Sequence, residues 1–384
     1  MTSLRSIKAS LRAATAQLKT EEANYEAQLL LQHALNVNRA WLISHEHENL
    51  PPSIHAAYRA MLERRLYGEP IAYILGVREF YGLKLKVSAA TLIPRADTET
   101  LVDAALAKIG LVDSPSPPFL PSPPFLPSPQ PLSHTGARGL NSQHEFPLPL
   151  RDRARERGES HDTSSSPSFP RKRESMLTLN QKMDSRVREN DEVENKKFEE
   201  KPYVALKSLD SDFRRNDNLS ILDLGTGAGA IALAIAKHRP QANITALDAS
   251  QAALDIAIEN AQHLSIANVK FLLSDWFSAL TNEKFDLIVS NPPYIEAEDA
   301  HLKRGDLRFE PLSALASGAE GLDDLRKIIA QAPNHLKPHG CLLLEHGYNQ
   351  AETVANLLKK AGFSEVETIK DLGGNNRVTL GKIS

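Results

Sequence analysis

The sequence predicts an α/β protein with a doubly wound, mostly parallel seven-stranded sheet and a small N-terminal helical domain. Two observations favour this fold class. After about residue 218, short apolar segments alternate with segments of helical periodicity, which is the pattern of strand–helix units in a parallel sheet covered on both faces. Before about residue 75, the apolar residues recur at helical spacing instead.

The N-terminal helical domain is predicted to span residues 1–75. Apolar side chains form a helical stripe from Glu22 to Leu35. A second long helix is predicted to start at Pro51-Pro52 and to continue through Leu66. Proline is favourable at that start because the N–H that it lacks would have no partner in the first helical turn.

A β-hairpin linker is predicted for residues 76–97. Phe80–Val87 alternates apolar and polar residues, as a half-buried strand does, and Thr91–Pro94 is the expected partner strand. The second domain is predicted to span residues 98–384, and it starts with a helix from Thr98 to Lys108.

Residues 113–217 interrupt this second domain with a segment that lacks the periodicity of a fold. Fourteen of the chain's 24 prolines lie there, and proline disrupts both helices and sheets. Low-complexity sequence of this kind is usually extended and solvated, and a ligand for a proline-reading domain is the alternative interpretation. The segment also resembles translated intergenic repeat DNA inserted in frame. We therefore expect deletion of residues 114–217 to leave the function of the second domain intact.

The seven strands of the second domain are predicted at Ser220–Leu224, Asn243–Leu247, Val269–Leu273, Phe285–Val289, Cys341–Glu345, Glu365–Ile369 and Arg377–Leu380. The helices between them are predicted at Ala230–Lys237, Gln251–Gln262, Leu322–Ala332 and Gln350–Ala361. Folds of this class bind their ligands at the carboxyl ends of the strands, so functional residues are expected there.

The composition excludes several classes of protein. A formal net charge of -3 gives no general attraction to nucleic acid or to an anionic membrane. No apolar run approaches the roughly 20 residues that span a bilayer, and the N-terminus lacks the apolar stretch of a secretory signal. The single cysteine, Cys341, lies in an apolar run and indicates a buried thiol in a reducing compartment. We expect a cytoplasmic monomer. No metal site is expected, because the 13 histidines show no metal-ligand spacing.

A glycine-rich loop joins the first strand of the predicted sheet to a helix. Its residues Gly225, Thr226, Gly227, Ala228 and Gly229 are predicted to bind a cofactor. Glycines let the backbone approach a ligand closely, and the N-terminus of the following helix favours an anionic group. The loop also fits the dinucleotide fingerprint, so a nicotinamide cofactor is an open alternative at this point.

Asp248, Asp275 and Trp276 follow the next two strands and are expected to complete the cofactor site. A carboxylate at position 248 can accept hydrogen bonds from both ribose hydroxyls, which serves NAD and S-adenosylmethionine equally. Asp275 is expected to supply a polar contact, and Trp276 an aromatic wall for an adenine. Alternatively, Asp248 caps a helix and Trp276 is a core residue.

The tetrapeptide Asn291-Pro292-Pro293-Tyr294 ends the fourth predicted strand and is the most specific signal in the sequence. The nitrogen of a planar NH2 group is a poor nucleophile because its lone pair is delocalised. The Asn291 side-chain oxygen and the Pro292 carbonyl can each accept one N–H of such a group, and the two prolines keep the loop stiff. Tyr294 can pack against the flat face of the substrate. We therefore predict S-adenosylmethionine as the cofactor, Asn291 and Pro292 as catalytic residues, substrate binding by all four residues, and cofactor contact by Asn291.

Five further motifs accompany these sites, at Glu69–Gly76, Arg78–Tyr81, Leu92–Arg95, Asp97–Glu99 and Arg308–Pro311. With them, the chain resembles the HemK/PrmC family over roughly residues 1–112 and 218–384. The resemblance implies a class I S-adenosylmethionine methyltransferase that methylates N5 of the glutamine in the Gly-Gly-Gln motif of class I peptide chain release factors. It also implies that the helical domain helps to dock the release factor, and that residues 291–294 hold the glutamine amide.

Other functions share some of these features. An exocyclic-amine methyltransferase acting on DNA or RNA would use the same tetrapeptide, but base flipping usually requires a basic channel, which the near-neutral charge does not indicate. A glutamine of a ribosomal protein is a related substrate. A nicotinamide oxidoreductase would leave the tetrapeptide without a role, and a non-catalytic binding protein would keep only the pocket. His346 is interpreted as a core residue, and the sequence assigns no role to Arg95 or Glu99.

Overall fold

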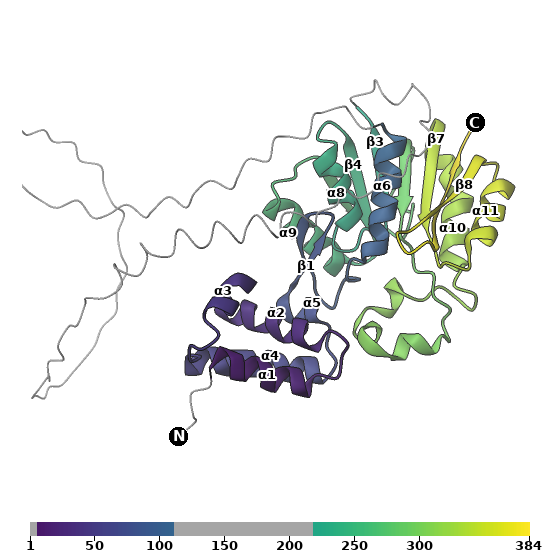
Figure 1. Cartoon of the computed structure of the whole chain (residues 1–384). Helices are drawn as coiled ribbons and strands as arrows, with labels where there is room; N and C mark the ends of the chain where they lie inside the picture. The colour runs from purple at the N-terminus through teal and green to yellow at the C-terminus, as the bar shows by residue number, and fades with distance from the viewer. Residues whose placement is uncertain (1–5, 111–217) are drawn as a thin grey trace, which may run out of the picture. The chain divides into compact units, whose positions relative to one another are not determined.

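The computed structural model describes residues 6–110 and 218–384, and the proline-rich segment predicted at 113–217 lies outside them. Up to residue 75 the described chain is all-helical, as predicted (Figure 1). The helices are α1 (Ile7–Gln17), α2 (Ala23–Leu35), α3 (Arg39–Ser44), α4 (Pro52–Leu66) and α5 (Ile71–Leu75). The prediction of α2 and α4 is confirmed, whereas the shorter helices were not located from the sequence.

Polar caps and buried leucines account for the helices of this domain. The Ser6 hydroxyl accepts a hydrogen bond from a first-turn N–H of α1, and the Asn38 side chain does the same for α3. The apolar faces of the helices meet in one core cluster, in which Leu30 and Leu31 of α2 are fully buried. Short helices gain most of their stability from such tertiary burial rather than from helix propensity, so α3 and α5 depend on this core.

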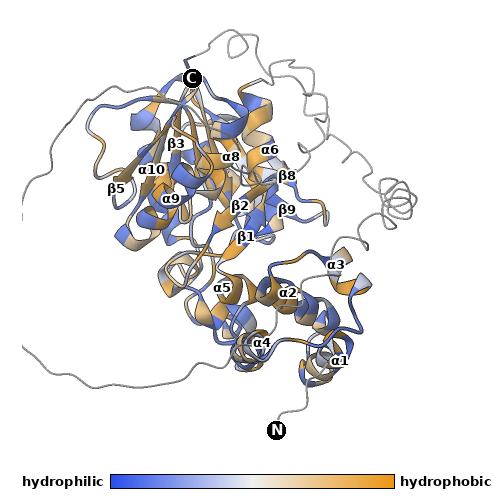
Figure 2. Ribbon diagram, turned by 90° about the vertical axis from the view of Figure 1, so that its left-hand side faces the viewer, coloured by the Kyte–Doolittle hydropathy of each residue, from blue (hydrophilic) through white to orange (hydrophobic). Residues whose placement is uncertain are grey.

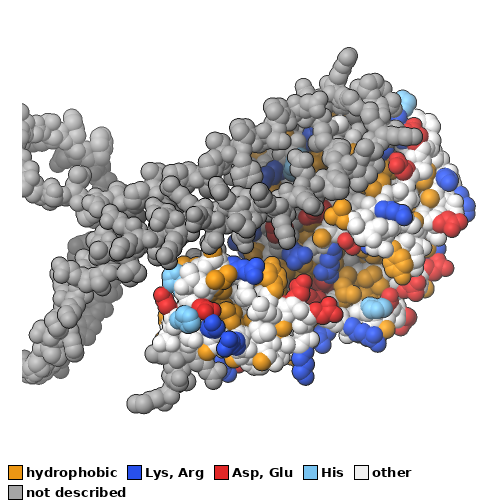
Figure 3. Space-filling model, in the orientation of Figure 1, with side chains coloured by type: hydrophobic (Ala, Val, Ile, Leu, Met, Phe, Trp, Pro, Cys, Tyr) orange, Lys and Arg blue, Asp and Glu red, His pale blue; other side chains and the backbone are white. Residues whose placement is uncertain are grey.

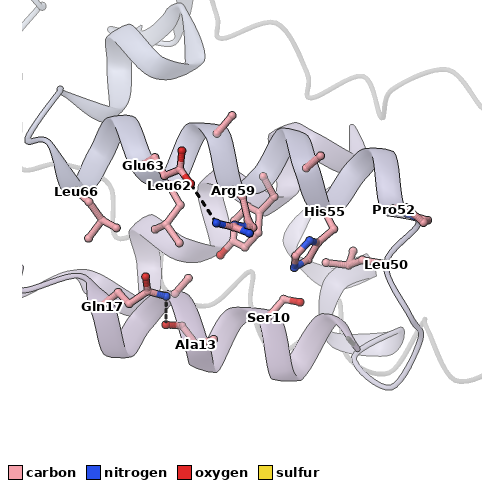
Figure 4. A pocket seen from close by; sticks show the side chains of 14 residues that line it. Ser10, Ala13, Gln17, Leu50, Pro52, His55, Arg59, Leu62, Glu63 and Leu66 are labelled. Carbon is pink, nitrogen blue, oxygen red and sulfur yellow. Dashed lines mark hydrogen bonds and ion pairs between the residues drawn. The ribbon is translucent and has the colours of Figure 1, made fainter. Parts of the chain in front are cut away.

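A groove of about 740 Å³ lies between α1 and α4 (Figure 4). Ser10 and Gln17 line it from α1, and His55, Arg59 and Glu63 line it from α4. The Arg59 guanidinium donates a hydrogen bond to Glu63 at 3.2 Å along the α4 surface. Every residue that lines this groove belongs to the helical domain. The groove is therefore separate from the strand ends at which the functional residues are predicted.

The β-hairpin after the helical domain is present, but its predicted strands are wrong. The paired strands are β1 (Val77–Phe80) and β2 (Leu83–Lys86), whereas Thr91–Pro94 forms no strand. Tyr81 and Gly82 have φ angles of 51° and 72°, and positive φ at two consecutive residues makes the tight two-residue turn that hairpins favour. The chain therefore reverses inside the segment that apolar alternation had predicted as one strand.

Seven strands form one sheet in the order β5-β4-β3-β6-β7-β9-β8 (Figure 1). They are β3 (Ser220–Leu224), β4 (Asn243–Asp248), β5 (Val269–Leu273), β6 (Phe285–Ser290), β7 (Leu336–Glu345), β8 (Ser364–Lys370) and β9 (Asn376–Lys382). Only β9 runs antiparallel to its neighbours, β7 and β8. The predicted mostly parallel seven-stranded sheet is confirmed, and β7 begins earlier than predicted, at Leu336.

Helices cover both faces of this sheet. One face packs against α6 (Glu99–Lys108), α8 (Ala230–His238) and α9 (Gln251–His263), and the other against α10 (Asp323–Gln331) and α11 (Ala351–Lys360). Successive residues of a strand point to opposite faces, so Ile221 of β3 belongs to one core cluster and Leu222 to the other. In Figure 2 the sheet accordingly carries hydrophobic residues between its helical layers.

Short 3-10 helices complete the described chain at η1 (Ala96–Thr98), η3 (Ala300–Lys303), η4 (Gly305–Phe309), η5 (Leu312–Ala314) and η6 (Ala332–His335). Most of them lie in the long connection between β6 and α10. Among the described helices, none combines the length and the apolar composition that a membrane span requires.

Candidate active site

The strand order reverses between β3 and β6, and the carboxyl ends of the strands at such a reversal form the usual ligand-binding crevice of this fold class. Leu224, the last residue of β3, is paired with Ser290, the last residue of β6. The glycine loop that starts at Gly225 and the tetrapeptide that starts at Asn291 therefore begin side by side. A cavity of about 570 Å³ lies at this point and is lined by residues of both segments.

The glycine loop has a backbone conformation that favours glycine at three positions. Gly225, Gly227 and Gly229 have φ angles of 72°, 55° and 84°, a region that other residues rarely adopt. The loop is also tied to the end of β4, because the backbone N–H groups of Gly225 and Thr226 donate to the Leu247 carbonyl at 2.9 Å each. The Gly227 N–H donates to the Asp248 carboxylate at 2.8 Å.

These hydrogen bonds bear on the choice between cofactors. A dinucleotide needs free backbone N–H groups at the start of the helix to hold its pyrophosphate. In this loop the N–H groups of Gly225, Thr226 and Gly227 are already engaged by β4, and that of Gly229 donates to the Thr226 carbonyl at 2.8 Å. These bonds involve the loop and not the first residues of α8, so they leave the choice between the two cofactors open.

The charge of the cavity favours S-adenosylmethionine as the cofactor. Carboxylates of Asp248, Asp275 and Asp324 border it, and none of the described residues that line it is Lys, Arg or His. A cleft lined by one sign of charge concentrates ligands of the opposite sign. The acidic lining suits the sulfonium and amino groups of S-adenosylmethionine, and Asp248, which lines the cavity, is the residue that would hold the ribose hydroxyls. These carboxylates are hydrogen-bond acceptors that fit the cofactor predicted from the sequence.

Trp276 forms one wall of the cavity beside the glycine loop. Its indole N–H donates to Asp324 at 3.2 Å, and its ring would lie 3.5 Å from a side-chain carbon added at Gly225. The same side chain packs against the core cluster beneath α10. Trp276 is therefore both a cavity wall and a partly buried core residue, whereas the sequence left these two roles as alternatives.

Not every residue of the predicted cofactor site reaches the cavity. Gly225, Gly227, Asp248, Asp275, Trp276 and Asn291 line it, whereas Thr226, Ala228 and Gly229 do not. The Thr226 hydroxyl donates to the buried Asp223 carboxylate at 2.7 Å, and Ala228 packs in a core cluster. A side-chain carbon at Gly229 would lie 3.2 Å from the Ala257 side chain. These three residues shape the loop from beneath.

The tetrapeptide is held from behind by a set of buried polar groups. The Asn291 side-chain nitrogen donates to the Thr98 hydroxyl at 3.2 Å. The Tyr294 hydroxyl donates to Glu345 at 3.3 Å, and the Gln350 side-chain amide donates to the Tyr294 carbonyl at 3.1 Å. The Asn291 side-chain oxygen accepts no hydrogen bond from the described residues. It therefore remains available to a substrate N–H group.

A second, smaller cavity of about 80 Å³ adjoins the tetrapeptide. Pro292 and Tyr294 line this small cavity, while Pro293 lines the larger one. Three residues, Leu92, Asn291 and Ala314, border both cavities. The tetrapeptide thus forms a common wall between a space large enough for a cofactor and a narrow space that suits a single side chain.

Arg95 lines the small cavity and forms an ion pair with Glu310, whose side chain is fully buried. The other Glu310 oxygen accepts the Ile93 N–H at 3.0 Å. Burial raises the pKa of Glu310, and the Arg95 charge opposes that shift. The pair fastens the segment after the hairpin to the connection that precedes α10. By contrast, Glu99 accepts the Tyr81 N–H at 3.1 Å and so braces the hairpin turn.

Glu345, at the carboxyl end of β7, is buried directly behind Tyr294. Burial raises its pKa to about 7, although the Thr98 hydroxyl, the Arg377 charge and the Tyr294 hydroxyl act in the opposite direction. The neighbouring His346 is also buried, with its ring nitrogens 2.7 Å from the Thr379 hydroxyl and 2.8 Å from the Gly347 carbonyl. Burial lowers the pKa of His346. The interpretation of His346 as a satisfied core residue is confirmed.

Several cavity residues were not predicted from the sequence. The segment Ala89–Leu92 lines the large cavity from beyond the hairpin, and Pro311, Ser313 and Ala314 line it from the connection before α10. Two of the sequence motifs lie in these regions, at Leu92–Arg95 and Arg308–Pro311. Their roles depend on contacts between residues more than 200 positions apart, such as the hydrogen bond from the Ile93 N–H to Glu310.

Comparison with known proteins agrees with this geometry. A family model described as PrmC N-terminal domain matches residues 7–76, and one described as methyltransferase domain matches residues 215–376. A release factor glutamine methyltransferase of Xylella fastidiosa is 37% identical over 374 residues, covering 97% of this chain and 97% of that protein. The protein of the same name from Escherichia coli is 36% identical over 373 residues, again covering 97% of both chains.

The likeness to solved structures is weaker. A methyltransferase from Pyrococcus furiosus is 20% identical with a TM-score of 0.35, and the match covers 53% of this chain and 98% of that one. The relatives, in contrast, match at more than a third of positions along almost the whole chain. The resemblance to the HemK/PrmC family is thereby confirmed: the chain belongs to the release factor glutamine methyltransferase family.

Proposed function

We propose that the chain transfers a methyl group from S-adenosylmethionine to the side-chain amide nitrogen of a glutamine in a peptide chain release factor. The observation that carries this proposal is the position of Asn291, whose side chain borders both the acidic cofactor-sized cavity and the small cavity. A glutamine side chain in the small cavity would present its NH2 group to the larger one at this shared wall.

Two residues of the tetrapeptide, Asn291 and Pro292, perform two tasks in this proposal. When bound, S-adenosylmethionine supplies an electrophilic methyl group on a sulfonium. The Asn291 side-chain oxygen and the Pro292 carbonyl accept the two N–H bonds of the substrate and so aim its nitrogen at that methyl. Both acceptors also stabilise the positive charge that develops on the nitrogen during attack. The methyl–sulfonium bond would break as the C–N bond forms, with the neutral thioether as leaving group, and the extra proton on the nitrogen would then pass to water, so no base is needed beforehand.

A protein substrate is supported by the surface around the small cavity. Leu312 is 63% exposed and directly precedes the cavity residues Ser313 and Ala314, and Tyr67 is 77% exposed at the end of the helical domain. The Tyr67 ring contacts the Phe309 ring at 6.0 Å. The ring contact joins the end of the helical domain to the connection that carries Leu312. We infer that the helical domain and this connection together dock the release factor.

The relatives' name supports a release factor as the substrate. The finer proposal is that the methylated residue is the glutamine of the Gly-Gly-Gln motif in class I release factors, and that the chain acts as a monomer. A DNA or RNA amine methyltransferase is the second candidate. On the face in Figure 3, basic and acidic side chains are interspersed over the coloured surface, which does not favour a channel for phosphates.

The test is incubation of the purified chain with labelled S-adenosylmethionine and release factor, followed by mapping of the labelled peptide. We expect label on the glutamine nitrogen of the release factor, and label on nucleic acid instead would overturn the substrate proposal. The variant Asn291→Ala should lose transfer while its affinity for S-adenosylmethionine stays within about threefold of the parent. The matched control is Asn282→Ala, an exposed asparagine outside both cavities. Equal loss of transfer and cofactor binding in Asn291→Ala would mean that its assigned role is wrong.

A further inference from the structure

The side-chain amide of asparagine has two similar ends with opposite hydrogen-bonding properties. Its oxygen only accepts and its NH2 group only donates, so a rotation by half a turn exchanges the two. In the proposed function, Asn291 must direct its oxygen at a substrate NH2 group. If the Asn291 amide were flipped, its NH2 group would face the substrate NH2 group. Two such donors cannot form a hydrogen bond, so the substrate would not be held. Some other group must therefore fix the orientation of this amide.

The structure offers one group for that purpose. Among the described residues, the Asn291 side chain makes a single hydrogen bond, from its nitrogen to the Thr98 hydroxyl at 3.2 Å. Thr98 is 4% exposed and ends η1, immediately before α6, far from Asn291 in sequence. A threonine at the start of a helix commonly accepts a hydrogen bond from the first turn. Thr98 accepts no such bond from α6, and its hydroxyl instead accepts the hydrogen bond from the Asn291 side-chain nitrogen.

A hydroxyl can both donate and accept, so Thr98 alone does not distinguish the two ends of Asn291. Glu345 supplies the asymmetry. This glutamate is 1% exposed, and its Oε2 atom has no hydrogen-bond partner among the described residues. The Thr98 hydroxyl is nevertheless close enough to be the foremost group that favours the charged form of Glu345. A hydroxyl that donates to the ionised carboxylate offers only its oxygen lone pairs to Asn291, which agrees with the direction of the hydrogen bond from the Asn291 side-chain nitrogen to Thr98.

The turn that carries Thr98 is held in place by an interaction of the preceding residue, Asp97. The neighbouring Asp97 accepts a hydrogen bond from Arg377 of β9 at 3.2 Å. Arg377 also donates to the buried carboxylate of Asp371 at 3.0 Å. The turn that carries Thr98 is therefore fastened to β9, which gives the hydroxyl a fixed position relative to Asn291.

We propose that Thr98 is a positioning residue of the methyltransferase: its hydroxyl accepts from the Asn291 side-chain nitrogen and thereby keeps the Asn291 oxygen directed at the reacting nitrogen. The proposal rests on the proposed function and explains the Asp97–Glu99 motif at its central residue. Thr98 touches neither cavity, so it acts through Asn291 and not on the cofactor.

The test compares Thr98→Val, which keeps the shape and removes the hydroxyl, with Thr98→Ser, which keeps the hydroxyl. For methylation of a release factor we expect Thr98→Val to lower kcat by about 10- to 100-fold, because loss of orientation has effects of this size. KM for the release factor and the affinity for S-adenosylmethionine should change less than about threefold. Thr98→Ser should recover activity to within about fivefold of the parent.

Two results would overturn the proposal. One is full activity of Thr98→Val, and the other is an equal loss in Thr98→Val and Thr98→Ser, which would indicate a packing role. A readout without substrate separates this question from the proposed function. The side-chain amide ¹H–¹⁵N signals of Asn291, assigned with Asn291→Ala, should shift in Thr98→Val and remain near the parent position in Thr98→Ser. Unchanged signals in Thr98→Val would contradict the hydrogen bond even if the parent methylates no release factor.

Discussion

Replacement of Glu345 by glutamine should change how the stability of the protein depends on pH. Burial raises the pKa of Glu345 from 4.5 to about 7. Between these values the folded protein keeps a proton on Glu345 that the unfolded chain releases, so the free energy of unfolding falls as pH rises through this window. One pKa unit corresponds to about 1.4 kcal/mol, and the whole shift to roughly 3 kcal/mol. From about pH 5.5 to about pH 8 the loss should be roughly 2 kcal/mol.

Glutamine has the shape of the protonated acid and no charge, so Glu345→Gln should lack this loss. Arg377 would keep Asp97 and Asp371 as partners in the variant. Urea unfolding at about pH 5.5 and about pH 8 measures the free energy of unfolding for parent and variant. The variant should gain roughly 2 kcal/mol relative to the parent between the two conditions. The control is Glu298→Gln, an exposed glutamate. Identical pH dependence of the parent and Glu345→Gln would refute the reasoning, because the other titrating groups are common to both.

Three further predictions concern the loop, the cavity wall and the helical domain. In urea titrations, Gly229→Ala should lower the free energy of unfolding by more than Gly374→Ala does. Both glycines have φ above 80°, so an alanine at either position carries a backbone strain of about 1–2 kcal/mol. Of the two, only Gly229 has neighbours within 4 Å of the added carbon. Trp276→Ala should weaken S-adenosylmethionine binding by about 10- to 100-fold in calorimetry, equivalent to about 1.4–2.8 kcal/mol of lost contact, and Trp276→Phe by less. Arg65→Ala should destabilise the chain by roughly 3 kcal/mol because Glu26, 10% exposed and paired with Arg65 at 2.7 Å, would be left as a buried charge without its partner.

The sequence by itself determined the elements whose pattern is local. The central strands β3 and β6 lie where runs of apolar residues predicted them, because a strand buried on both faces needs a continuous apolar run. The glycine loop and the tetrapeptide could be placed at one site without a structure, since both follow strands whose carboxyl ends share one edge of a parallel sheet. The role proposed for the tetrapeptide also came from the sequence, because Asn291 and its prolines offer acceptors without competing N–H groups.

Only the tertiary structure decided how individual side chains and turns are used. Alternation from Phe80 to Val87 suggested one strand, but the hairpin turns at Tyr81 and Gly82 because the backbone there takes positive φ, which the polarity pattern does not encode. Likewise, Thr226 follows Gly225 in the glycine loop, yet its hydroxyl donates to the buried carboxylate of Asp223 and not to the cavity.

The support behind the active site was least visible in the sequence. Thr98 and Asn291 are 193 positions apart, and Glu345 reaches them from a third element. A linear pattern records the period of a helix or strand, whereas a hydrogen bond between distant segments depends on how those elements pack. The local pattern therefore predicts which residues stand at the strand ends, and only the packing of distant elements brings Thr98 into contact with Asn291.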